Sequence, residues 1–272
     1  MQHQNPTVSI SYLKEQLEQR QNELQKALTH IRQAHAIEPD GKLRIAMTKG
    51  TPQYYRIIDA KDTVGGYIRK ENQELISLLA QKGYHAKTEK NIKKELHEIE
   101  KLISLWGKPV ENIYDELNAA RKDLVSPLLV SDEIFEARWL AEQYESDPYY
   151  PENKIYETKR GEMVRSKSEM MIADVYYELD IPYRYEAKLT LQGGLYKFPD
   201  FTVLHKKTRE IIYHEHFGLL NQEEYRLKAL QKIEVYQKAG IYLGKNLIIT
   251  YETEETPFNI RQIKKMFKKV FQ

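Results

Sequence analysis

The chain has 272 residues, of which 41% are hydrophobic and 30% charged, and its formal net charge is +2 at pH 7. This length suits one large domain or two ordinary ones, and the net charge is too small to indicate nucleic-acid binding by itself. Cysteine is absent, which excludes disulfides, thiolate catalysis and cysteine-ligated zinc. No apolar run approaches the roughly 18 residues of a membrane span, and the N-terminus lacks the features of a signal peptide. We therefore expect a cytoplasmic protein that does not bind membranes.

The N-terminal region is predicted to be mainly helical with a small β element. Helical periodicity runs from about residue 12 to 37, and the turn residues at 39–41 end it. Short strands are expected within residues 41–57 and 65–71, around glycine-containing turns. A leucine seam on the first helix suggests an arm for homo-oligomerisation or for a partner protein. The seam consists of Leu13, Leu17, Leu24 and Leu28.

Helical patterns return from residue 72 to about 105, with predicted breaks at KGYHAK (82–87) and at WGKPVE (106–111). Residues 115–144 also have a helical pattern, with a predicted break at Pro127. This middle region therefore reads as further helices that follow the small β element.

A domain boundary is predicted in the segment ESDPYYPENKIY (145–156), where prolines and polar residues cluster. Beyond it we expect helices over 167–179, 222–239 and 259–272, and strands over 183–191, 196–205, 210–217 and 245–252. This order indicates an α/β domain with a mixed sheet. The predicted parts are a helical arm (1–38), a mixed helical and β accessory module (39–147) and a C-terminal domain (148–272).

The expected terminal helix has basic side chains beside an apolar face. The apolar positions are Ile260, Ile263, Phe267 and Val270, and the basic ones are Arg261, Lys264, Lys265, Lys268 and Lys269. Both a solvated amphipathic helix and a ridge that faces phosphates fit this pattern.

Two acids, Asp200 and Glu215, interrupt otherwise apolar strands. A turn at 206–209 pairs Leu204 with Ile211 and places Asp200 opposite Glu215 on the same face of the hairpin. Facing like charges are destabilising, and buried carboxylates more so, unless a divalent cation compensates them. The alternative is that this face is exposed and both acids are solvated.

Glu169 is a third candidate acid. It lies on the same helical stripe as Ile172 and Tyr176, which directs it inward. It also fits the third position of a capping box that begins at Ser166. Both interpretations are kept open.

These acids carry a family resemblance. Glu169 on a helix, Pro199-Asp200 on one strand and Glu215 on the next resemble the PD-(D/E)XK nuclease superfamily. The order of elements from about residue 166 to 251 also resembles that family's αβββαβ core. The resemblance implies a restriction-endonuclease-like C-terminal domain that hydrolyses phosphodiester bonds of nucleic acid, with DNA favoured. It also suggests phage defence or DNA repair as the setting.

The resemblance has one departure. The family pattern places a lysine two residues after the second acid, where this chain has Phe217. Some relatives supply the cation from the next helix, so Lys232 is our first candidate and Lys228 the second. Gln231 and Tyr236 resemble a Gln and a Tyr that several nuclease branches carry on this helix. If the lysines are only solvated, an inactive nuclease-fold protein that binds nucleic acid or assembles a complex becomes the better interpretation.

The resemblance also implies a metal ion. Asp200, Glu215 and the carbonyl of His216 would hold Mg²⁺, with Glu169 acting directly or through water, and Mn²⁺ would substitute. Lys232 would orient the attacking water or stabilise the transition state.

Two other features have a structural and a functional interpretation. His214 and His216 project to one side of a strand and could bind zinc or iron, although packed histidines explain them as well. The 20 tyrosines include the segments QYYRI, YESDPYY and DVYYELDIPYRYE. Packing between helices and strands is favoured for them over stacking on bases.

Overall fold

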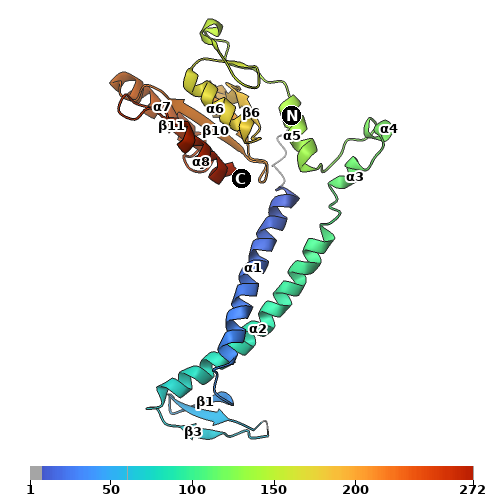
Figure 1. The fold of residues 1–272 in the computed structure, drawn as a ribbon, viewed down its shortest axis with the longest axis vertical. Coiled ribbons are helices and arrows are strands. Elements are labelled where there is room, and N and C mark those ends of the chain that lie inside the picture. The colour runs from blue at the N-terminus through green and yellow to red at the C-terminus, as the bar shows by residue number, and fades with distance from the viewer. Residues whose placement is uncertain (1–7, 60, 272) are drawn as a thin grey trace. The chain divides into compact units, whose positions relative to one another are not determined.

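The computed structural model describes residues 8–59 and 61–271 and divides into two compact units (Figure 1). Unit 2 is Leu13–Pro109, and unit 1 combines the residues up to Tyr12 with Val110–Gln272. Unit 2 is therefore inserted into unit 1 along the chain. The predicted parts 1–38, 39–147 and 148–272 follow a different division and stay predictions.

Two long helices, α1 (Ile10–His35) and α2 (Gln73–Leu105), form most of unit 2. They pack antiparallel (Figure 1), and Arg20 of α1 donates to Glu95 of α2 at 2.8 Å. Their apolar cluster contains Leu24, Leu28, Ile31, Ile92 and Ile99. The predicted leucine seam is thus partly buried within the chain itself.

Helix α2 confirms one predicted boundary and corrects another. It ends at Leu105, so the break at 106–111 is confirmed. The break predicted at 82–87 is wrong, because α2 continues through this segment. One interior glycine, Gly83, costs only about 1 kcal/mol relative to alanine, and the packing of α2 against α1 outweighs that cost.

The small β element is a three-stranded antiparallel sheet in the order β1-β2-β3. Its strands are β1 (Lys42–Thr48), β2 (Thr51–Ile57) and β3 (Gly66–Ile68). Lys49 and Gly50 both have positive φ, as a two-residue turn between twisted strands requires. Ile68 packs against Leu79 and Ile76 of α2, so the sheet covers the start of that helix.

Residues 110–144 contain less helix than predicted. Three helices are present: α3 (Asn112–Asp115), α4 (Ala119–Lys122) and α5 (Asp132–Ala141). Ser131 caps α5 by accepting from the N–H of Ile134, so the helix starts after Pro127 rather than continuing across it. Asp132 then accepts hydrogen bonds from Ser9 and Ser11, which attaches residues 9–11 to α5.

The C-terminal part of unit 1 contains a four-stranded mixed sheet in the order β11-β10-β9-β6. β10 and β11 are parallel, and the other neighbouring strands are antiparallel. Its strands are β6 (Tyr183–Tyr185), β9 (Phe201–Leu204), β10 (Ile211–Phe217) and β11 (Leu247–Tyr251). The α/β class and the mixed sheet predicted for this region are confirmed.

The predicted hairpin register is confirmed, since Leu204 pairs with Ile211. Two predicted strands are shorter than expected. Residues 183–191 divide into β6 and β7 (Leu189–Thr190), and residues 196–205 divide into β8 (Tyr196–Lys197) and β9. β7 and β8 form a separate small hairpin around the 3₁₀ turn Gln192–Gly194. Asp200 therefore lies at the start of β9, one residue before the paired ladder.

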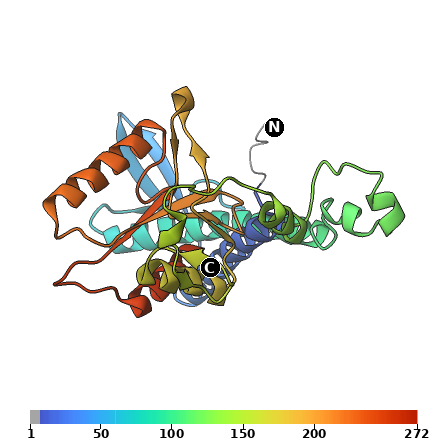
Figure 2. The ribbon, with the colours of Figure 1, turned by 90° about the horizontal axis from the view of Figure 1, so that it is seen from above.

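Helices cover both faces of this sheet. α6 (Lys167–Glu178) and α8 (Ile260–Phe271) pack together on one face, where the ring of Tyr176 stacks on Phe267 at 4.4 Å. α7 (Glu223–Lys238) lies on the other face (Figure 2). Its Tyr236 packs there with Leu247 of β11. A short hairpin, β4 (Tyr156–Glu157) and β5 (Met163–Val164), and the 3₁₀ turn Pro151–Asn153 precede α6. Among the described residues, no helix combines the length and apolarity needed to cross a membrane.

Candidate active site on the mixed sheet

Glu215 lies near the centre of β10 and is only 1% exposed. Its Oε2 accepts from Nζ of Lys232 at 2.5 Å, and its Oε1 accepts from the hydroxyl of Tyr236. Lys232 and Tyr236 are four residues apart on α7, so both point to the same carboxylate. One turn of α7 thus neutralises and orients the Glu215 carboxylate, whose burial as an unpaired charge would strongly destabilise the fold.

Asp200 lies beside Glu215 at the start of β9. Its Oδ2 accepts from the N–H of His216 at 2.6 Å. Burial, together with the charge of Glu215, raises the pKa of Asp200 to about 7, against the opposing effects of Lys232 and the His216 N–H. The site therefore resists holding two anions at once, as expected for carboxylates that lie close together.

Glu169 lies in the first turn of α6, and its contacts agree in part with both interpretations drawn from the sequence. Its N–H donates to Oγ of Ser166 at 3.1 Å, which is half of a capping box. Its carboxylate accepts from the hydroxyl of Tyr185 at 2.5 Å and from the N–H of Arg165 at 3.2 Å. Burial and the charge of Asp200 raise the pKa of Glu169, so the two acids interact electrostatically.

The two lysines considered as the source of the missing positive charge differ in their surroundings. Lys232 bonds Glu215, whereas Lys228, one turn earlier, pairs with Glu224 at 2.7 Å on the exposed side of α7. Gln231 is exposed. Phe217 is 5% exposed, so β10 ends in an apolar side chain where the family pattern has a lysine.

His214 and His216 are packed in the interior. His214 contacts the hydroxyls of Tyr176 and Thr250 at 2.8 Å each, and His216 contacts Thr250 at 2.9 Å and Glu252 at 3.4 Å. Burial lowers the pKa of His214 to about 3, and it also lowers the pKa of His216. Their ring nitrogens already have protein partners, which supports the packed interpretation over zinc or iron binding.

Metal-ligating side chains are sparse at the site. Across residues 8–59 and 61–271, no group of three or more His, Asp or Glu side chains is arranged to hold a metal ion. A cation here would depend on Asp200 and Glu215, a backbone carbonyl and water.

The sequence reasoning missed an ion-pair cluster next to Asp200. Glu186 follows β6, is 5% exposed and has a positive φ of 48°. It accepts from Nε of Arg165 at 2.5 Å, and Nζ of Lys154 lies 2.6 Å away. Its N–H donates to the carbonyl of Asp200 at 3.0 Å. The sequence feature that could have indicated this cluster is the acid Glu186 within YRYEAKLTL. In the continuous strand predicted for that segment, Glu186 had no distinguishing position.

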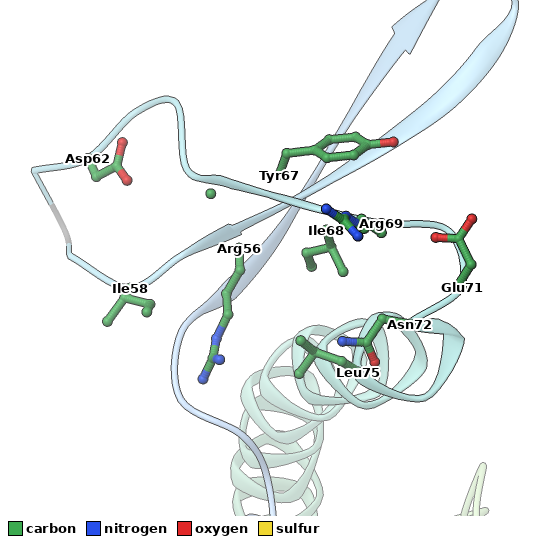
Figure 3. A pocket seen from close by; sticks show the side chains of 10 residues that line it. Arg56, Ile58, Asp62, Tyr67, Ile68, Arg69, Glu71, Asn72 and Leu75 are labelled. Carbon is green, nitrogen blue, oxygen red and sulfur yellow. The ribbon is translucent and has the colours of Figure 1, made fainter.

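Unit 2 has a pocket of about 800 Å³ beside its small sheet (Figure 3). Ile68 and Leu75 face one another at its base. Asp62 accepts from the N–H groups of Val64 and Gly65 at 2.9 Å, so its carboxylate holds the adjoining loop. The pocket does not reproduce the paired buried acids of the mixed sheet.

Comparisons with known proteins give little further information. No model of a known protein family matches the chain, and no solved structure matches it. An uncharacterized protein of Methanocaldococcus jannaschii is 36% identical over 97 residues, which is 35% of this chain. The chain spans only 8% of that protein's length. The match assigns neither a family nor a function.

Proposed function

We propose that unit 1 contains a metal-dependent nuclease with the restriction-endonuclease-like core of the PD-(D/E)XK superfamily. Its reaction would be hydrolysis of phosphodiester bonds in nucleic acid, with DNA favoured. The element order α6, β6, β9, β10, α7, β11 supports this proposal, as does the parallel pairing of β10 with β11. The observation that carries it is the bond from Lys232 to Glu215 beside Asp200, which offers a cation from α7 in place of the one lacking at Phe217.

The donor set fits Mg²⁺ or Mn²⁺, which favour carboxylate and carbonyl oxygens with several retained waters. Asp200, Glu215 and the carbonyl of His216 would hold the ion, and Glu169 would act directly or through water. The raised pKa of Asp200 supports this fit, because a divalent cation would favour the ionised carboxylate that the protein alone disfavours. When bound, the ion would polarise the phosphate and lower the pKa of a water ligand.

The side chains of α7 would have distinct roles. Lys232 is 28% exposed, so its ammonium can contact both Glu215 and a phosphate or water next to it. There it would orient the attacking water or stabilise the charge that develops on the phosphate. Tyr236 is fully buried and holds the other oxygen of Glu215, which makes it a positioning residue.

A second candidate function is a catalytically inactive nuclease fold that binds nucleic acid or assembles a complex. The specific observation in its favour is that both oxygens of Glu215 already have protein partners. In addition, the described residues contain no group of three or more His, Asp or Glu side chains that could hold a metal ion. A role in phage defence or DNA repair, and a cytoplasmic location, are part of the first proposal.

The test is a cleavage assay on single- and double-stranded DNA and RNA with Mg²⁺ or Mn²⁺. We expect wild type to cut at least one substrate, and Asp200→Ala and Glu215→Ala to cut none. Glu224→Ala is the matched control, because Glu224 is an exposed acid on α7. Cleavage that survives in both site variants would contradict the site. Binding without cleavage of any substrate would favour the second candidate.

A further inference from the structure

Three tyrosines near the candidate site have exposed side chains. The exposed fractions are 57% for Tyr149, 68% for Tyr150 and 44% for Tyr196. By contrast, Tyr176 and Tyr236 of the same unit are fully buried. Packing between elements therefore does not account for the three exposed rings, although it was the favoured interpretation of the tyrosine-rich segments.

The exposed pair is held in place by a single guanidinium. Arg165 donates to the carbonyls of Tyr149 and Tyr150 at 2.6 and 2.8 Å, while its Nε donates to Glu186. The N–H of Asp147 also donates to the carbonyl of Glu186 at 3.1 Å. Tyr150 has a positive φ of 49°, a strained conformation that these contacts maintain. The loop that presents the two rings is therefore well anchored.

The same two anchoring residues contact the candidate catalytic acids. The N–H of Arg165 donates to Glu169, and the N–H of Glu186 donates to the carbonyl of Asp200. The tyrosine loop and the acids thus share one hydrogen-bonded frame. Any ligand bound on the tyrosines would have its position set relative to the acids.

Tyr196 extends this surface from the β7–β8 hairpin. The segment before Tyr149 is joined to the chain that leads into this hairpin, because the N–H of Lys188 donates to the carbonyl of Glu145 at 2.8 Å. An interaction with Tyr196 that raises the pKa of Tyr149 agrees with this placement. The ring of Tyr196 packs edge-on against Phe198 at 5.7 Å, and Nζ of Lys188 lies 5.2 Å from its centre. Phe198 is two residues before Asp200. Nζ of Lys188 also pairs with Glu145 at 2.5 Å, so the surface combines aromatic rings with a salt-bridged cation.

We propose that Tyr149, Tyr150 and Tyr196 form a platform on which the unpaired bases of single-stranded nucleic acid stack. The platform rests on the proposed function in that nucleic acid is its ligand. Exposed aromatic faces beside a cation bind unpaired bases without reading their sequence. In a duplex the base faces are already stacked, so the platform selects single strands or frayed ends. Its frame directs the adjoining phosphates towards Asp200 and Glu215.

The test is binding of the full-length chain to a fluorescein-labelled oligothymidylate, measured by fluorescence anisotropy in EDTA so that no cleavage occurs. Stacking contributes about 1–3 kcal/mol per base, so we expect Tyr149→Ala/Tyr150→Ala to bind about 5- to 150-fold more weakly for each base that loses its ring. Tyr149→Phe/Tyr150→Phe keeps the ring faces and should bind like wild type. Tyr242→Ala is the matched control, because Tyr242 is 50% exposed outside the platform.

Several outcomes would overturn the platform. These are unchanged binding by the double alanine variant, equal losses for the alanine and phenylalanine variants, and wild-type binding of a duplex as tight as of the single strand. The metal-free assay keeps this test separate from the nuclease proposal. If wild type cuts nothing with Mg²⁺ but the alanine variant still loses single-strand binding, the nuclease proposal fails and the platform stands. If wild type cleaves nucleic acid with Mg²⁺ but the double alanine variant binds the single strand as tightly as wild type, the platform is wrong and the nuclease proposal stands.

Discussion

Replacing Asp200 by asparagine is expected to stabilise the protein at neutral and alkaline pH. In the folded protein, burial and Glu215 raise the pKa of this carboxyl from 3.8 to about 7. In the unfolded chain it returns to its ordinary value, so between these values the folded state binds more protons. The free energy of unfolding therefore falls as the pH rises through this window, by about 1.4 kcal/mol per pH unit. Over the whole window the cost reaches about 4 kcal/mol.

The asparagine side chain introduced by Asp200→Asn cannot ionise, yet its oxygen can still accept from the N–H of His216. We therefore expect Asp200→Asn to gain stability over wild type as the pH increases, with the difference growing by about 2 kcal/mol between pH 5 and pH 7. Urea unfolding at several pH values, followed by circular dichroism without divalent cations, measures this difference. Removing the charge at position 200 also lowers the raised pKa of Glu169, which changes the difference in the same direction. Titrating groups that do not interact with Asp200 cancel.

The reasoning would be refuted by a stability difference that stays constant from pH 5 to pH 8. The same variant should have no cleavage activity on a substrate that wild type cuts. If Asp200 is a functional acid held at a cost in stability, Asp200→Asn should be more stable and inactive. If Asp200→Asn loses both stability and activity, the aspartate has a purely structural role.

Other substitutions test the contacts around the site. Lys232→Met leaves the buried carboxylate of Glu215 without its cation and should cost about 3–5 kcal/mol of stability in urea unfolding, whereas Lys228→Met, whose lysine pairs only with an exposed acid, should change little. Tyr236→Phe removes one hydrogen bond to a charged group and should cost about 1.5–3 kcal/mol; an unchanged melting midpoint would mean that this hydroxyl contributes nothing. Arg209→Met should cost about 3–5 kcal/mol in the same assay, because Arg209 is 6% exposed and pairs with Asp132 at 2.7 Å.

The sequence predicted the elements of the mixed sheet well, because local patterns determine most of them. The turn at 206–209 sets the hairpin register, so the pairing of Leu204 with Ile211 follows from the turn and from the apolar alternation. The closeness of Asp200 to Glu215 follows from the same register. The choice of Lys232 over Lys228 depended on the family resemblance, because the two lysines lie on adjacent turns of one helix.

What the sequence could not predict depends on long-range packing or on local strain. Gly83 and its neighbours read as a break because the contacts of α2 with α1 are invisible in a local window. The kink at Glu186 needs a non-glycine residue with positive φ, which no propensity favours. Arg165 is separated from Glu186 by a whole helix in the chain, so their ion pair, and the tyrosine loop that it anchors, appear only in the fold.

The insertion of unit 2 has a consequence for the order of folding. Ser9 must find Asp132 across 123 residues, and closing a loop of that length has an entropic cost that rises with the logarithm of its length. Within unit 2, the β1–β2 hairpin that joins the two helices has local contacts, which form quickly. Because α1 and α2 run antiparallel (Figure 1), the formation of unit 2 brings the start of α1 and the end of α2 to the same end of the helical pair. Early folding of the inserted unit would therefore shorten the effective loop that separates the two segments of unit 1.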